Sequence, residues 1–181
     1  MLFYIVIGIL VLIAIYTVVT YNKFVTFGEN VENAMASISA QIESRWDALR
    51  SLIDATKSYA AHESSTLENI VDARSQVSKS SNVEDVEKDN ELFTKAMGRL
   101  NVVIENYPDL KASQTYLEAM RSIDKYENYV RQSRMIFNDT ATKFNRLTKQ
   151  FPSNIVASLF GFSPKEYFKY SEDKSNPPAW N

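Results

Sequence analysis

The feature that most constrains this chain is an uninterrupted apolar stretch at its amino-terminal end, from Leu2 to Thr20. The stretch contains no charged side chain, and the first one along the chain is Lys23. As an α-helix rising about 1.5 Å per residue, it would reach roughly 28 Å, which is close to the hydrocarbon thickness of a bilayer. We therefore expect residues 1–22 to form a transmembrane anchor.

A cleaved secretory signal and a buried core helix are the alternatives to an anchor. A signal needs a positively charged start, a shorter apolar core and a cleavage site of small residues. Met1 is followed directly by apolar residues, and Tyr16, Val18 and Tyr21 offer no Ala-x-Ala pattern. The sequence therefore favours a single-pass anchor that is retained.

The charges beside the anchor give an expectation about orientation. Lys23, Arg45 and Arg50 follow the apolar stretch, whereas only the amino terminus precedes it. Lysine and arginine near a span tend to stay on the cytoplasmic side, and acidic residues count little. We therefore expect a cell-membrane protein with a short amino terminus outside and the bulk of the chain in the cytoplasm.

The rest of the chain reads as helical. The whole chain contains only four glycines and five prolines, and no proline occurs from Val31 to Tyr107. From Phe24 to Ala60, apolar residues recur at steps of three and four, which places them on one face of a helix. Nothing between Thr20 and Phe24 needs to break the helix, so the anchor is expected to continue directly into it.

Two further segments show the same spacing, from Val83 to Tyr107 and from Tyr116 to Phe151. Pro108 disfavours helix in the residue before it, and Ser113 is suited to cap the last long helix. Near His62 two interpretations stay open. Ser65–Glu68 fits a capping box that would start a new helix, but the apolar spacing also runs on without a break.

These elements predict an all-α fold in which a transmembrane helix continues into an antiparallel, up-down bundle of four long helices. We expect the anchor in residues 1–22, the bundle in 23–152, a short aromatic-rich segment in 153–170 and a disordered tail in 171–181. The tail prediction follows from its charges, serines and paired prolines.

The sequence offers little for catalysis or for binding metals and nucleic acid. His62 is the only histidine, and there is no cysteine. The acidic run from Glu84 to Glu91 lacks the glycine and spacing of a calcium loop, so we interpret it as the solvated start of a helix. The net charge is −2 with both signs interleaved, which provides no basic surface for nucleic acid. We expect no enzyme, metal site or cofactor.

An aromatic group near the carboxyl terminus is the candidate contact surface. It shows little helical periodicity and combines rings with basic side chains, in Phe160, Phe162, Lys165, Tyr167 and Phe168. If the last long helix runs back toward the membrane, this group reaches the lipid interface or a neighbouring subunit, where lysines suit anionic headgroups. The alternative is that the rings close the open end of the bundle's own core.

Several motifs are similar to those of the LemA family. The most specific is Glu105–Ser113, which reads ENYPDLKAS. The others are Tyr21-Asn22, Val31–Ala34 with Ile38, Tyr59–Glu63, Phe144-Asn145, Phe151–Asn154 and Leu159–Phe162. The resemblance extends from the anchor to about Phe168.

The chain departs from the family pattern at two positions that affect packing. Met35 stands where the family usually has tryptophan, and Phe144 stands where it usually has tyrosine. The resemblance implies a bacterial single-pass membrane protein with a short external amino terminus and an antiparallel helical bundle inside. It implies no settled biochemical activity.

The features together lead to two functional hypotheses. The first is a non-enzymatic scaffold at the membrane surface that acts through helix–helix contacts with copies of itself or with protein partners the sequence does not name. The second is a membrane-remodelling or lipid-sensing protein that uses the aromatic carboxy-terminal segment at the lipid interface. Both involve the lipid bilayer as a partner.

Overall fold

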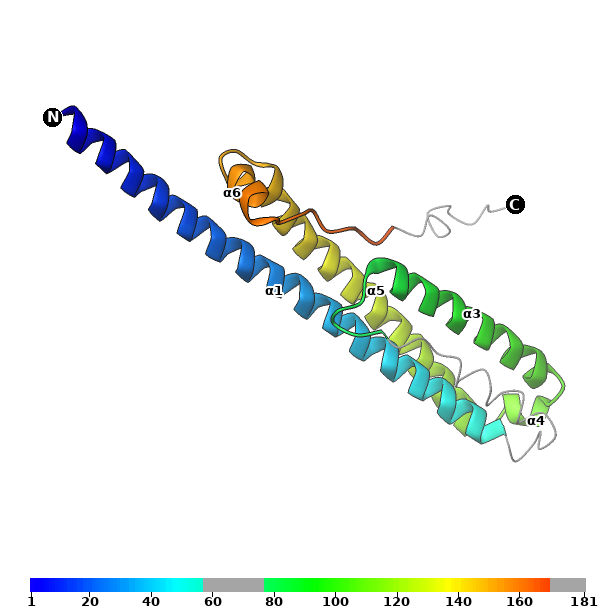
Figure 1. Cartoon of the computed structure of the whole chain (residues 1–181). Helices are drawn as coiled ribbons and strands as arrows, with labels where there is room; N and C mark the ends of the chain where they lie inside the picture. Colours follow the sequence, from blue (N-terminus) through cyan, green and yellow to red (C-terminus); the bar gives the residue numbers. More distant parts are fainter. Residues whose placement is uncertain (57–76, 170–181) are drawn as a thin grey trace, which may run out of the picture.

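The computed structural model describes residues 1–56 and 77–169. Within these ranges the chain forms helices and no strand, which confirms the all-α prediction (Figure 1). The helices are α1 (Leu2–Thr56), α3 (Val83–Glu105), α4 (Pro108–Lys111), α5 (Gln114–Lys149) and α6 (Ser153–Phe160). The two interpretations left open near His62 and the disordered tail predicted in 171–181 concern residues outside the described ones.

Helix α1 is one uninterrupted helix of 55 residues, so the predicted continuation of the anchor into the bundle is confirmed. At about 1.5 Å per residue it is roughly 80 Å long. Its apolar amino-terminal part is long enough to cross a membrane and has no side chain buried within the structure. Buried side chains begin at Thr20 and recur as far as Thr56. We call the unpacked residues 2–19 the bare half of α1 and the remaining, longer part, residues 20–56, its packed half.

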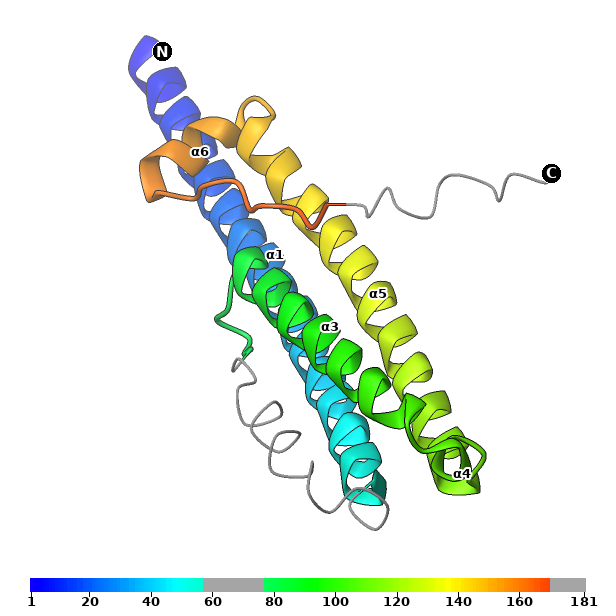
Figure 2. The same cartoon turned by 90° about the vertical axis from the view of Figure 1, so that its right-hand side faces the viewer.

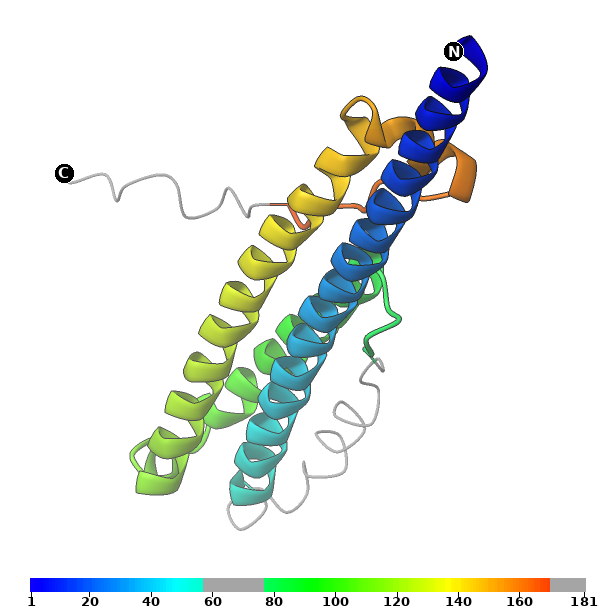
Figure 3. The same cartoon turned by 90° about the vertical axis from the view of Figure 1, so that its left-hand side faces the viewer.

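Helix α5 runs antiparallel to the packed half of α1, and the two lie side by side along most of the length of α5 (Figures 1 and 3). Helix α3 lies against this pair at the end far from the amino terminus (Figure 2). The core between the helices is built from aromatic and branched side chains, including Phe24, Ile38, Trp46, Leu49, Val86, Leu100, Val130 and Phe144. This matches the up-down arrangement expected from the helical spacing.

Local capping explains where the helices begin. The Asn82 side chain accepts a hydrogen bond from the Asp85 N–H at 2.9 Å, and the Asp85 carboxylate accepts from the Asn82 N–H at 3.0 Å. This reciprocal pair is a capping box, and it starts α3 at Val83. The predicted cap of α5 is also present, because the Ser113 hydroxyl accepts from the Tyr116 N–H at 3.2 Å.

Helix α6 crosses the long axis of the bundle next to α1 (Figure 2). It follows a turn containing the cis Phe151–Pro152 peptide bond. It ends at Phe160 and is capped by Gly161, whose φ of 75° lies in the left-handed region that favours glycine. Residues 161–169 then leave α6 without helix and run back over the bundle (Figure 2).

Candidate functional site

An aromatic cluster joins α6 and the segment after it to the other helices, at the level where the bare half of α1 ends. It consists of Tyr21, Phe24, Phe144, Phe160 and Phe162. The Phe162 ring stacks on Phe24 with centroids 4.6 Å apart, and Phe24 meets Phe144 edge to face at 5.8 Å. The Phe160 ring meets Tyr21 at 4.9 Å. The cluster therefore ties α6 to α1 immediately after the apolar stretch.

Two asparagines of α5 hold the extended segment 161–169 by its backbone. Asn145 donates to the Lys165 carbonyl at 2.8 Å and accepts from the Lys165 N–H at 2.7 Å. Asn138 makes the same pair of bonds to Phe168, both at 2.9 Å. Seven helical residues rise about 10.5 Å, and three extended residues span about 10 Å. The two spacings match, so both asparagine side chains can hydrogen-bond to the backbone of the same extended segment.

The structure separates the five candidate contact residues into two groups. Phe162 packs within the aromatic cluster, and Phe168 is only 3% exposed with its ring 5.1 Å from that of Phe137. These two rings pack against the core of the bundle itself rather than facing outward. Phe160, Lys165 and Tyr167 remain exposed.

A charged cluster inside the bundle was missed by the sequence analysis. Arg45 of α1 and Asp89 of α3 are both 0% exposed and form an ion pair at 3.0 Å. Arg45 also pairs with Glu127 of α5 at 2.7 Å, and Trp46 donates its indole N–H to Asp89 at 3.0 Å. One guanidinium thus connects all three long helices of the described chain.

The interpretation of the acidic run as a solvated helix start is wrong for Asp89, which is fully buried and faces Arg45. The next residue, Asn90, is half-buried and accepts a hydrogen bond from Arg45 at 3.2 Å. The spacing is compatible with this burial, because Arg45 lies three residues after Ile42 and Asp89 three after Val86. Both charges therefore fall on a buried helix face.

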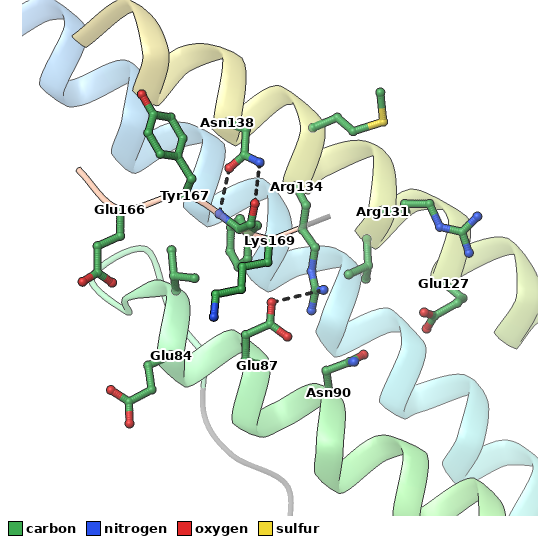
Figure 4. A pocket seen from close by; sticks show the side chains of 14 residues that line it. Glu84, Glu87, Asn90, Glu127, Arg131, Arg134, Asn138, Glu166, Tyr167 and Lys169 are labelled. Carbon is green, nitrogen blue, oxygen red and sulfur yellow. Dashed lines mark hydrogen bonds and ion pairs between the residues drawn. The ribbon is translucent and has the colours of Figure 1, made fainter. Parts of the chain in front are cut away.

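A pocket of about 1030 Å³ lies between α3, α5 and the extended segment (Figure 4). Arg134 extends into it and approaches Glu87 at 3.6 Å, and burial lowers the pKa of its guanidinium. The Nε and Nη2 atoms of Arg134 are buried and make no hydrogen bond to the described residues. Charges of both signs line the pocket, in Glu84, Glu87, Glu127, Arg131, Arg134, Glu166 and Lys169.

In the described part of the chain, no three histidine, aspartate or glutamate side chains are close enough to hold a metal ion. Hydrogen bonds involving Thr142 and Asn145 lower the pKa of the Tyr167 phenol, which stays exposed to solvent. The chemistry these side chains support is ion pairing and hydrogen bonding.

Comparison with known proteins identifies the family. The model of the LemA family matches residues 34–180, which is most of the chain. This chain belongs to the LemA family. The match covers α1 from Ala34 onward and every later helix of the described residues, so the predicted resemblance to the LemA family is confirmed.

Individual LemA-family relatives align over most of this chain. Protein LemA of Metamycoplasma hominis is 31% identical over 156 residues, covering 83% of this chain and 69% of that protein. Magnetosome protein MamQ of Magnetospirillum gryphiswaldense is 26% identical over 190 residues, covering 90% of this chain and 70% of that protein. Magnetosome protein MamQ 2 of Paramagnetospirillum magneticum is 26% identical over 175 residues, with 82% and 64% covered.

Proposed function

We propose that this protein is a membrane-anchored helical scaffold whose bundle stands at the cytoplasmic surface and associates with copies of itself. One observation carries the proposal: α1 is a single helix that is bare and apolar at one end and packed into the bundle at the other. Such a helix needs no linker between membrane and bundle, so the bundle would be held at a defined orientation. A fixed orientation favours lateral assembly, because copies meet with the same faces.

The outer surface of the bundle supports the self-association part of this proposal. Helix α5 exposes Tyr129 and Ile136, which lie seven residues apart and so share one side of the helix. The buried Arg45–Asp89 pair, in contrast, serves a contact inside the bundle. The proposal therefore assigns the function to surfaces of the helices rather than to a reactive centre.

The mass of the solubilised full-length protein tests self-association. One chain has a mass of 20.7 kDa, so light scattering that separates protein from detergent distinguishes one copy from two or more. We expect an oligomer that Ile136→Gln weakens, because this change places a polar amide on the exposed α5 face. Val102→Gln is the matched control, since Val102 is exposed on α3. A monomer at micromolar concentration removes self-association from the proposal.

The orientation is tested separately with a single cysteine. The chain has no cysteine of its own, so Val102→Cys introduces one exposed thiol in the bundle. A membrane-impermeant maleimide should label it only after the cells are lysed if the bundle is cytoplasmic. Labelling of intact spheroplasts would place the bundle outside.

A further inference from the structure

Helix α6 carries apolar side chains on both of its faces. Ser153, Val156 and Ala157 are buried against the bundle. The outward side, together with the preceding turn, forms what we call the α6 patch: Phe151 (81% exposed), Ile155 (58%), Leu159 (71%) and Phe160 (47%). A helix whose second face met water would carry polar or charged residues there. The α6 patch therefore needs an apolar neighbour.

The charge pattern around the α6 patch indicates what kind of neighbour fits. No charged residue occurs from Phe151 to Pro164, whereas Lys149 precedes this stretch and Lys165 follows it. Arg146 and Lys149 occupy the last turn of α5. An apolar surface bordered by cations is the pattern of a helix that lies in the interface of a membrane with anionic lipids.

The position of α6 relative to α1 places the patch at the membrane surface. Phe160 contacts Tyr21, and Thr20 is only 4% exposed at this level of α1. The apolar stretch of α1 ends at the same residues, and the first charge follows at Lys23. Helix α6 also lies across the axis of α1 rather than along it (Figure 2). A bilayer crossed by α1 would therefore have its headgroup region at α6, roughly parallel to it.

We propose that α6 is a second membrane contact, an interfacial helix that lies in the headgroup region of the leaflet from which α1 emerges. The α6 patch would enter the acyl boundary to the depth of about 5–10 Å that is typical of such helices. Lys149 and Lys165 would contact anionic headgroups. This inference rests on the membrane span in the proposed function, since that span sets the level of the bilayer.

Site-directed spin labelling of the full-length protein tests the inference. The chain has no cysteine, so Leu159→Cys provides one labelling site, and its exposure means that the change leaves the core intact. The labelled protein is reconstituted in phosphatidylcholine–phosphatidylglycerol liposomes, and collision rates of the nitroxide with oxygen and with a water-soluble nickel chelate are measured. Leu10→Cys in the bare half of α1 is the lipid control, and Val102→Cys on α3 is the water control.

The expected result is a Leu159→Cys label that collides with oxygen and is shielded from the nickel chelate, with a ratio several-fold above that of Val102→Cys. A label as accessible to nickel as Val102→Cys overturns the inference, since the patch then faces water. A label shielded from both reagents also overturns it, because a protein surface, such as a second copy, then covers the patch.

The Leu10→Cys control separates failure of this inference from failure of the proposed function. If Leu10→Cys lies in lipid while Leu159→Cys faces water, α1 spans the bilayer and only the interfacial role of α6 is refuted. If Leu10→Cys also faces water, the membrane span itself is refuted. Omitting phosphatidylglycerol should reduce the depth at Leu159→Cys if the lysines contribute, and a nitroxide depth that is unchanged would overturn their assigned role.

Discussion

The buried Arg45–Asp89 pair gives the most quantitative prediction for this protein. Both partners are 0% exposed, and the ion pair is 3.0 Å long. Breaking a buried pair by neutralising one partner typically costs about 3–5 kcal/mol, because the other charge stays buried. Asp89→Asn keeps the side-chain volume and an acceptor for Trp46, and Glu127 still pairs with Arg45. We therefore expect a loss near the lower end, about 3 kcal/mol of unfolding free energy.

Glu127→Gln is the matched control within the same cluster. The Glu127 side chain is 42% exposed, so solvent screens its pair with Arg45. We therefore expect neutralising the exposed partner of this pair to cost about 1 kcal/mol or less, as for ion pairs that solvent screens. For a chain of this size, about 1 kcal/mol shifts the melting temperature by roughly 2–4 °C. Asp89→Asn should therefore lower it by about 6–12 °C, and Glu127→Gln by no more than about 4 °C.

Trp46 provides the assay, because its indole N–H contacts Asp89 directly. The chain has two tryptophans, so Trp180→Phe leaves Trp46 as the only one. Its fluorescence is followed during thermal and guanidinium unfolding in mild detergent, alone and in an Arg45→Met background. In the Arg45→Met background, Asp89→Asn should lower the free energy of unfolding far less, because no Arg45 guanidinium remains to be left unpaired. An equal cost of Asp89→Asn in both backgrounds, or a smaller cost than that of Glu127→Gln, would refute the reasoning.

Three further predictions concern two glycines and the extended segment. In chemical unfolding, Gly98→Ala should stabilise α3 by about 0.5–1 kcal/mol, because a Cβ there meets no atom within 4 Å. Gly161→Ala should lower the free energy of unfolding by about 1–2 kcal/mol, because the φ of Gly161 is positive. Asn145→Ala should remove both hydrogen bonds to Lys165, and hydrogen exchange at the Lys165 amide should then accelerate at least about tenfold. Asn128→Ala, which loses only an exposed bond within α5, should leave that amide unchanged.

Much of the fold could be predicted because its determinants are local. The absence of a breaker between Thr20 and Phe24 was enough to predict the continuous α1. The start of α5 followed from one serine in capping position, at Ser113. The end of α3 followed from the restriction that Pro108 places on the residues before it. Each of these depends on a few neighbouring residues.

The buried cluster could not be predicted because its determinants are distant in sequence. The spacing of α3 fits two stripes that share Val86, Phe93 and Leu100 and differ in choosing Asp89 or Asn90. A carboxylate is the costlier group to bury, so spacing and polarity alone favour the asparagine for the buried position. Only the approach of Arg45, from another helix, reverses the preference.

The course of residues 161–169 was also beyond sequence reasoning. The segment has no helical period, and its backbone is held by side chains of Asn138 and Asn145 on another element. Phe168 is buried for the same reason, because the grip of Asn138 sets its ring against Phe137. Two polar residues seven positions apart in a helix are too common for this spacing to predict such an arrangement.

If α1 spans the bilayer as proposed, its unbroken course makes the bundle a rigid extension of the membrane-spanning helix. From Tyr21 to Thr56 the helix extends roughly 50 Å beyond the apolar stretch. A transmembrane helix changes its tilt when the bilayer becomes thicker or thinner. A change of about 10° would sweep the Thr56 end sideways by roughly 9 Å. Because α1 has no break between Leu2 and Thr56, a change in bilayer thickness would shift the position of the far end of the bundle.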